Sequence, residues 1–136
     1  MKAAAFHYMQ PKTVDEALGC LEQLGSDATI LAGGQSLMAS LNMRLSNPAV
    51  LIDINAIDEL NGISVVEGRL RIGAMTRQAE LEYSPLVSQH APLITMVMPH
   101  IAHPAIRNRG TIGGSIAFAD PAAELPACLV ALNGQV

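Results

Sequence analysis

Two short stretches of the sequence contain adjacent glycines: AGGQSL at residues 32–37 and TIGGS at residues 111–115. Glycine reaches positive φ at little cost and has no Cβ, so consecutive glycines allow backbone N–H groups to converge on an anion. Phosphate is the anion that such loops usually hold. Both stretches are therefore candidates for binding a phosphate or a diphosphate group.

The first pair follows an apolar segment and precedes a possible helix start. The N–H groups of Gly34, Gln35 and Ser36 would then lie at a helix N-terminus, with the Ser36 hydroxyl as an additional donor. Thr111 and Ser115 stand before and after the second pair. Together, the two stretches would hold a diphosphate from two sides.

A tight turn or a close approach of two backbone segments also explains an isolated glycine pair, and for one pair it is the simpler interpretation. Neither stretch has the G-x-G-x-x-G spacing of a Rossmann turn or the G-x-x-x-x-G-K-[ST] spacing of a P-loop, and no lysine follows either pair. Two similar pairs in one small chain nevertheless favour the diphosphate interpretation over two unrelated turns.

Other reactive side chains do not form a recognisable catalytic or metal site. His100 and His103 have H-x-x-H spacing, but zinc needs at least three protein ligands and no third ligand is near them in the sequence. Ser36 and Ser115 lack the G-x-S-x-G context of a nucleophile elbow. We therefore expect no catalytic side chain and no metal ligand.

Two arginines, Arg107 and Arg109, precede the second glycine pair. They could neutralise a pyrophosphate, or they could position the loop by pairing with a carboxylate such as Asp120. The structural role is the preferred interpretation.

Composition restricts the classes of protein that fit. The chain has 136 residues, half of them hydrophobic and 15% charged, which is enough apolar surface for a folded core. A net charge of -4, with only two Tyr and two Phe, argues against a nucleic-acid partner. Cys20 and Cys128 have no CxxC spacing, so we expect both to be reduced.

The longest apolar stretches, such as LITMVM, are far shorter than the roughly 20 residues that span a bilayer. The first ten residues also lack the sustained apolar region of a secretory signal. These features predict no membrane span and a cytoplasmic location.

The elements that must position the glycine stretches can be predicted from periodicity and from turn residues. Apolar residues at helical spacing predict a helix between Thr13, which begins a T-x-x-E capping signal, and Gly25. Strands are expected at 28–32 and 50–54, with one or two helical turns at 36–45 between them.

In the second half, alternating residues on either side of Glu67-Gly68 predict a hairpin with one buried face. Thr76 is expected to cap a helix that extends to Tyr83, and 125–132 is expected to be a further helix. Because strands and helices do not alternate regularly, the pattern predicts an α+β fold rather than a doubly wound parallel sheet.

The stretches YMQPKTVDEAL, AGGQSL and IRNRGTIGGSIAFADPAAELP follow one another along nearly the whole chain. In this combination they resemble the FAD-binding medium subunit of molybdenum hydroxylases of the carbon monoxide dehydrogenase and xanthine dehydrogenase types. Those subunits share the FAD-binding fold of vanillyl-alcohol oxidase.

The resemblance implies that two loops enclose the pyrophosphate of FAD. Glu124 would contact the adenosine part through ribose hydroxyls, with Asp120 as a weaker candidate. The residues alone leave a second interpretation of Glu124 open, a solvated charge at a helix start. The first loop comprises Ala32, Gly33, Gly34, Gln35, Ser36 and Leu37, and the second comprises Thr111, Ile112, Gly113, Gly114 and Ser115.

The resemblance further implies two FAD-binding subdomains, at 1–57 and 58–136, with the second truncated because the family subunit is about twice as long. The implied function is that of a flavoprotein component that passes electrons from iron–sulfur clusters to an external acceptor. The implied partners are a molybdopterin-binding large subunit and a 2Fe-2S small subunit. The alternative is a truncated, non-catalytic fragment or subunit-interaction module that does not hold FAD on its own.

Overall fold

The computed structural model describes residues 2–136, and the chain divides into two compact units. Unit 1 is Met1–Glu59 and unit 2 is Leu60–Val136. The parallel sheet of unit 1 and the antiparallel hairpin and helices of unit 2 together confirm the predicted α+β class for the chain. The assignment of two FAD-binding subdomains to this chain stays a prediction.

Unit 1 contains a parallel sheet of three strands in the order β1-β3-β2. β1 is His7–Met9, β2 is Ala28–Leu31 and β3 is Val50–Asp53. All four residues of β3 are buried, as expected for the central strand of a parallel sheet. The predictions of β2 and β3 are confirmed, whereas β1 was missed because it is short and every residue in it is exposed.

Two helices connect these strands. α1 (Val14–Leu24) joins β1 to β2, and α2 (Leu37–Asn42) joins β2 to β3. Thr13 caps α1 by accepting a hydrogen bond from the Glu16 N–H at 3.1 Å, and Gly25 follows it with a φ of 52°, both as predicted. A short 3-10 helix, η1 (Gly25–Asp27), precedes β2.

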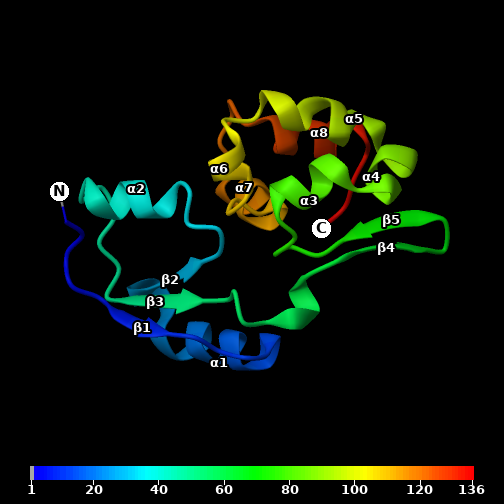
Figure 1. Ribbon diagram of the computed structural model, residues 1–136. Helices are drawn as coiled ribbons and strands as arrows, with labels where there is room; N and C mark the ends of the chain where they lie inside the picture. Colours follow the sequence, from blue (N-terminus) through cyan, green and yellow to red (C-terminus); the bar gives the residue numbers. More distant parts are fainter. Residues whose placement is uncertain (1) are drawn as a thin grey trace. The chain divides into compact units, whose positions relative to one another are not determined.

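In Figure 1, α1 and α2 lie on opposite sides of the strands of unit 1. This arrangement follows from the strand order β1-β3-β2. The connection from β1 to β2 and the connection from β2 to β3 run across the sheet in opposite directions. Because such connections are right-handed, their helices cover opposite faces of the sheet. Within unit 1, strands and helices therefore alternate regularly, contrary to the sequence-based expectation. The three loops that leave the strands lie at the carboxyl edge of the sheet.

Unit 2 begins with an antiparallel hairpin of β4 (Ile63–Val66) and β5 (Arg69–Ile72). Glu67 and Gly68 have positive φ values of 51° and 77°, as a two-residue turn between twisted strands requires, and the predicted hairpin is confirmed. Three partly buried hairpin side chains pack against the core of unit 2: Ile63, Leu70 and Ile72.

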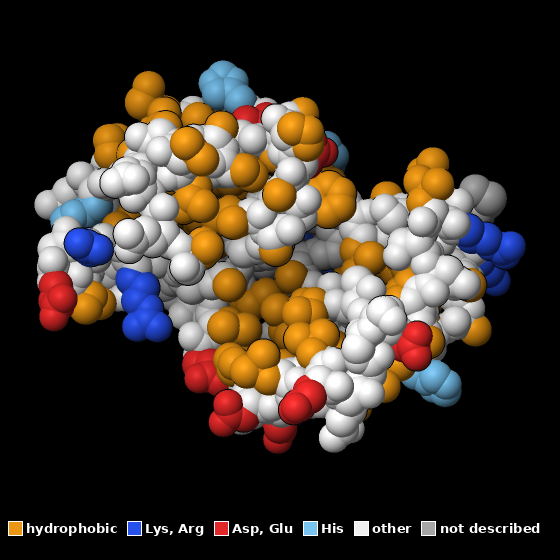
Figure 2. All heavy atoms as spheres, turned by 180° about the vertical axis from the view of Figure 1, so that it is seen from behind, with side chains coloured by type: hydrophobic (Ala, Val, Ile, Leu, Met, Phe, Trp, Pro, Cys, Tyr) orange, Lys and Arg blue, Asp and Glu red, His pale blue; other side chains and the backbone are white. Residues whose placement is uncertain are grey.

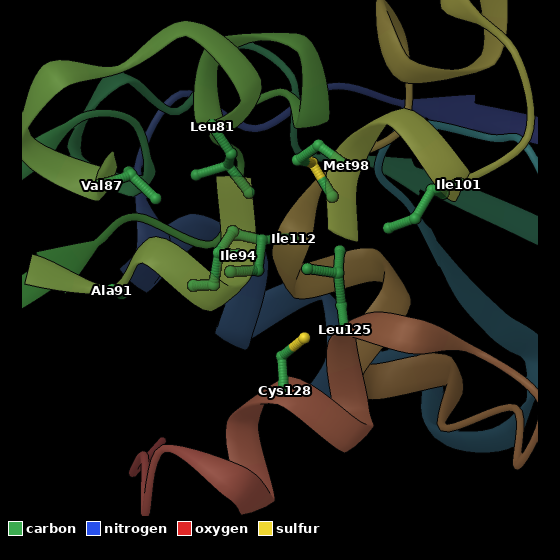
Figure 3. Close-up of a cluster of buried hydrophobic side chains, with 9 residues drawn as sticks. All are labelled: Leu81, Val87, Ala91, Ile94, Met98, Ile101, Ile112, Leu125 and Cys128. Atoms are coloured by element: carbon green, nitrogen blue, oxygen red, sulfur yellow. The ribbon is translucent and has the colours of Figure 1, made fainter. Parts of the chain in front are cut away.

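The rest of unit 2 is helical, and its helices pack around one hydrophobic core that includes both the N-terminal residue of α7 and the buried face of α8 (Figure 3). No helix within residues 2–136 is long and apolar enough to cross a membrane. The helices are α3 (Gln78–Tyr83), α4 (Pro85–His90), α5 (Pro92–Val97), α6 (Pro104–Arg107), α7 (Ile112–Phe118) and α8 (Glu124–Ala131), with the 3-10 helix η3 (Met98–His100). A further 3-10 helix, η2 (Asp58–Leu60), contains the boundary between unit 1 and unit 2 in the sequence. The core residues are Leu81, Val87, Ala91, Ile94, Met98, Ile101, Ile112, Leu125 and Cys128.

Thr76 does not cap α3, so that prediction is wrong. The N-cap is Arg77, whose N–H donates the reciprocal bond of the capping box to Glu80 Oε1 at 3.2 Å. Thr76 is fully buried, and its hydroxyl both accepts from the Gly62 N–H at 3.2 Å and donates to the Gly62 carbonyl at 3.1 Å. A buried hydroxyl needs such partners. Thr76 therefore holds Gly62, the residue before β4, in place instead of capping α3.

Arg107 has the structural role that was preferred, but its partner is not Asp120. Its Nε donates to Glu82 Oε2 at 2.8 Å and its Nη1 donates to the Ile101 carbonyl at 2.9 Å. Asp120 instead accepts from the Ala122 N–H at 2.8 Å. Arg107 thus ties the segment that leads into TIGGS to α3.

Replacing Glu82 tests this ion pair. Glu82→Gln should lower the free energy of unfolding by about 3 kcal/mol, because it leaves the buried Arg107 guanidinium without a carboxylate. Urea denaturation measures the loss. Arg69→Gln removes a charge from an exposed position of β5 and should change stability by less than about 0.5 kcal/mol. Equal stability of the two variants would contradict a supporting role for the pair.

Candidate functional site

The first glycine stretch forms the loop between β2 and α2, at the carboxyl edge of the parallel sheet. Ligands of open parallel sheets commonly bind outside this edge. Gly34 has a φ of 72°, and a Cβ at this position would lie 3.2 Å from both Leu31 Cδ1 and Met38 Cγ. The loop conformation therefore requires a glycine at residue 34.

The carbonyl groups of three successive residues in this loop are each held by a hydrogen bond within unit 1. One donor is a side chain that follows β3, one belongs to the loop itself, and one is a backbone N–H of α2. The bonds are Asn55 Nδ2 to the Ala32 oxygen at 2.9 Å, Gln35 Nε2 to the Gly33 oxygen at 2.9 Å, and the Met38 N–H to the Gly34 oxygen at 3.0 Å.

In the part of the chain that the structure describes, no hydrogen bond engages the N–H groups of residues 33–37. The C=O and N–H of a trans peptide group point in opposite directions. Each carbonyl that accepts a bond from the protein therefore directs the N–H of the next residue away from the donor of that bond. The loop thus offers consecutive donors, which fits a phosphate or diphosphate. Since α2 has only six residues, these donors matter more than a helix macrodipole.

The second glycine stretch is different, because its N–H groups already have partners. Residues 112–118 form α7, and its N-cap Thr111 accepts from the Gly114 N–H at 3.1 Å. The N–H groups of Ile112 and Gly113 donate to the carbonyls of Thr76 and Ala74 at 3.1 and 2.8 Å, and that of Ser115 donates to the Thr111 carbonyl at 3.2 Å. In this structure these N–H groups are therefore bonded within unit 2, and their convergence on an anion stays a prediction.

Close packing explains the glycine at position 113. A Cβ there would lie 2.6 Å from both the Cβ and the carbonyl oxygen of Ala74, which is so close that α7 or the Ala74 backbone would have to move. The side chain of the preceding Ile112 is one of the buried core residues drawn in Figure 3. Cofactor contacts by residues 111–115 stay a prediction. The Ser115 hydroxyl has no hydrogen-bond partner among residues 2–136 and is the group available for them.

Glu124 is the first residue of α8 and is half-buried. Burial, and secondarily the negative charge of Glu124, raise the pKa of the Cys128 thiol one turn further along the helix. No hydrogen bond to the Glu124 carboxylate is found within residues 2–136, so its oxygens can accept from a ligand. Glu124 and TIGGS belong to unit 2 whereas AGGQSL belongs to unit 1, so the two-sided clamp stays a prediction.

A polar network beside the AGGQSL loop was not found from the sequence. Asp53 ends β3 and is buried, and its Oδ2 accepts from the Tyr8 hydroxyl and from Gln10 Nε2, the latter at 3.3 Å. Its Oδ1 accepts from both the backbone N–H and the Nδ2 of Asn55 at 2.9 and 2.5 Å. A carboxylate inside the apolar run VLIDI was the available signal, because buried charges require partners.

These contacts shift the pKa values of both acidic groups in the network. Burial alone would raise the pKa of Asp53, but hydrogen bonds from Tyr8, Asn55 and Gln10 outweigh it, and the pKa lies below its ordinary value. The same bond to Asp53 raises the pKa of the Tyr8 hydroxyl. At neutral pH the network therefore consists of a carboxylate and a neutral phenol.

A separate pocket of about 500 Å³ lies in unit 1, between the end of β1 and α1. It contains none of the predicted cofactor residues. His100 and His103 are both exposed, and no group of three possible metal ligands occurs within residues 2–136. The pocket is lined by Met9, Gln10, Pro11, Glu16, Gly19, Cys20 and Gln23.

Comparisons with known proteins agree on one family. Residues 4–136 match the family model described as the FAD binding domain in molybdopterin dehydrogenase. The 6-hydroxypseudooxynicotine dehydrogenase complex subunit alpha of Paenarthrobacter nicotinovorans is 48% identical over 136 residues, which are 100% of this chain and 46% of that protein. The carbon monoxide dehydrogenase medium chain of Hydrogenophaga pseudoflava is 47% identical over 130 residues, 96% of this chain and 45% of that one.

Solved structures show the same similarity. The carbon monoxide dehydrogenase from Hydrogenophaga pseudoflava superimposes with a TM-score of 0.92 at 48% identity, over 93% of this chain and 44% of that chain. The quinoline 2-oxidoreductase from Pseudomonas putida 86 gives a TM-score of 0.89 at 43% identity, with the same coverage. The present chain therefore spans a little less than half the length of the relatives it matches.

The pKa of Asp53 predicts a pH-dependent contribution to stability. Because the folded-state pKa lies below the ordinary value of 3.8, the contribution is fully present above that pH and is lost as pH falls through the folded-state value. Asp53→Asn should therefore cost about 2 kcal/mol at pH 7, with the difference from wild type shrinking below pH ~4 in urea denaturation. Asp27→Asn, at an exposed position, serves as control; a pH-independent loss for Asp53→Asn would contradict the assignment.

The packing of Gly113 gives a second prediction. Gly113→Ala should lower the free energy of unfolding by about 1–3 kcal/mol in the absence of any ligand, because its methyl group would meet Ala74. Gly19→Ala, inside α1 with no atom within 4 Å of the added Cβ, should raise it by about 0.5–1 kcal/mol. Thermal unfolding of both variants tests this. A Gly113→Ala chain as stable as wild type would show that packing does not require this glycine.

Proposed function

The chain belongs to the family of FAD-binding domains in molybdopterin dehydrogenases, and from this membership we propose that it is the FAD-binding part of an electron-transfer subunit. This subunit passes electrons from iron–sulfur clusters to an external acceptor. The observation that carries the proposal is the run of N–H groups at residues 33–37, which have no partner among the described residues.

In this proposal, residues 32–37 bind the pyrophosphate of FAD. A diphosphate brings several acceptor oxygens and negative charge, and consecutive N–H donors match both. The hydroxyl of Ser36 adds a donor, since it makes no capping bond to α2. Gly34 leaves the approach to the backbone open and supplies the positive φ that the loop needs.

Residues 111–115 and Glu124 form the second wall of the proposed site. The Ser115 hydroxyl provides a polar contact, and the Glu124 carboxylate accepts hydrogen bonds from the two ribose hydroxyls. The buried Thr111 and Ile112 fix the start of α7, so Ser115 projects from a held backbone. Rigid support of this kind keeps polar groups in the geometry that a ligand requires.

FAD, when bound, supplies the hydride and one-electron chemistry. The side chains of this chain bind and orient the cofactor, and none of them has to act as an acid or a base. The remainder of the flavin-binding surface would come from sequence that the relatives have and this chain does not cover, since they are about twice as long.

A molybdopterin-binding large subunit and a 2Fe-2S small subunit are the proposed partners. Exposed apolar side chains occur in both units, and Figure 2 shows hydrophobic side chains among the surface atoms. We infer that a partner or further chain covers part of this apolar surface. Among the most exposed apolar side chains are those of Leu45, Tyr83, Met96 and Val130.

The alternative function is a subunit-interaction module that does not hold FAD on its own. The exposed apolar side chains fit this alternative as well. The free N–H groups of the AGGQSL loop favour FAD binding, because buried or half-buried donors normally have a partner.

Titration of the purified chain with FAD separates the two functions. We expect saturable quenching of flavin fluorescence, because the AGGQSL loop offers donors to the pyrophosphate. Bovine serum albumin at the same concentration controls for nonspecific quenching. A linear, unsaturated response identical to that control would reject FAD binding by this chain and leave the interaction module.

Two glycine variants locate the site. Gly34→Asp should weaken FAD binding at least tenfold, because it brings a carboxylate to the pyrophosphate and strains a residue with a φ of 72°. Gly68→Asp is the matched control: it adds the same charge at a φ of 77°, with no atom within 4 Å of its Cβ, in the turn of the β4–β5 hairpin. Equal FAD affinities of the two variants would place the pyrophosphate elsewhere.

A further inference from the structure

We propose that Asn55 and Asp53 are positioning residues for the pyrophosphate loop, and that they act by fixing the orientation of the Ala32–Gly33 peptide group. The proposal rests on the FAD-binding function proposed above. Neither residue belongs to a glycine stretch, and neither has to touch the cofactor. Their effect passes through one backbone carbonyl, that of Ala32.

The first step is the contact between Asn55 and the loop. Asn55 follows β3, and its Nδ2 donates to the Ala32 carbonyl oxygen at 2.9 Å across a separation of 23 residues. The peptide that joins Ala32 to Gly33 is planar and trans, so its N–H points away from its C=O. Holding the oxygen on Asn55 therefore directs the Gly33 N–H, the first unpartnered donor of the loop, to the side opposite Asn55.

The second step is the support of Asn55 by Asp53. The Asn55 side chain and backbone both donate to Asp53 Oδ1, so the asparagine is held at two points. Asp53 itself lies in the central strand, is buried, and has its other oxygen bound by Tyr8 and Gln10. All of these hydrogen bonds involve Asp53, which belongs to β3. The carboxylate therefore links the position of β3, through Asn55, to the position of the loop.

The third step is the register of the two strands. The Ile54 N–H donates to the Leu31 carbonyl at 3.1 Å, which continues the pairing of β2 with β3 up to the residue before the loop. The Asn55 amide then takes over at the next carbonyl, that of Ala32. Without it, the Ala32–Gly33 peptide would be the first one after the sheet without an anchor, and glycine allows it to rotate at little cost.

The test is Asn55→Ala, compared with Thr13→Ala as a control for stability. Asn55→Ala removes the side-chain bonds to Ala32 and Asp53, and Thr13→Ala removes the capping bond of α1, which has no link to the loop. Both should lower the midpoint of thermal unfolding by a few degrees. Only Asn55→Ala should also raise the dissociation constant for FAD, by about fivefold to tenfold.

A wild-type dissociation constant for Asn55→Ala, or an equal loss of affinity in Thr13→Ala, would overturn the positioning role. A purely structural role predicts the second result, because both variants would then act only through stability. Tyr8→Phe provides an intermediate case: it removes one bond from Asp53 Oδ2 and leaves Asn55 in place, so it should lower stability with less than a twofold change in FAD affinity.

A second measurement tests the positioning role without FAD. If the wild-type chain bound no FAD, only the proposed function would be rejected, and this measurement would still decide whether Asn55 fixes the loop. Backbone 15N relaxation should give rigid Gly33 and Gly34 amides in the wild type and in Thr13→Ala, with order parameters of about 0.85. In Asn55→Ala, these two amides should fall below about 0.6 while β3 stays rigid. Unchanged order parameters in Asn55→Ala would overturn the proposal.

Discussion

Backbone N–H groups that leave water need a hydrogen-bond partner, and the two glycine stretches of this chain meet that constraint in different ways. In TIGGS, the N–H groups of residues 112–115 donate to Thr76, Ala74 and Thr111, so all four are hydrogen-bonded within unit 2. In AGGQSL, the carbonyls are bound and the N–H groups of residues 33–37 have no partner among the described residues. This difference supports the proposal that the first loop binds a pyrophosphate, whereas the N–H groups of the second are already bonded within unit 2.

A buried carboxylate organises the edge of the sheet from which the first loop leaves. Asp53 accepts bonds from Tyr8 in β1, from Gln10 just after β1 and from Asn55 after β3. Through Asn55 it reaches the loop that follows β2. The cost of burying a charge is offset by these donors, which hold the pKa of Asp53 below its ordinary value. All three carboxyl-terminal strand ends of unit 1 are thereby joined through one side chain.

Unit 2 uses packing and one buried ion pair for a similar purpose. Ile112 anchors the N-terminal residue of α7 in the core, and Gly113 allows α7 to approach Ala74 closely. Arg107, paired with Glu82, holds the preceding segment against α3. These contacts leave Ser115 and Glu124 as groups that can face a ligand, on elements whose backbones are fixed.

Local signals in the sequence determined the capped helix at 14–24, the strands β2 and β3, the hairpin turn at Glu67-Gly68 and the family, because each depends on neighbouring residues or on motifs. They also drew attention to both glycine stretches. The strand β1, the pairing of Arg107 with Glu82, the buried role of Thr76 and the network of Asp53 required the tertiary structure. Each of these unites residues far apart in the chain, and whether an N–H group is free or bound depends on acceptors that local sequence does not contain. The tertiary structure alone therefore distinguished a glycine loop with unpartnered N–H groups, the proposed pyrophosphate site, from a glycine stretch whose N–H groups are bonded.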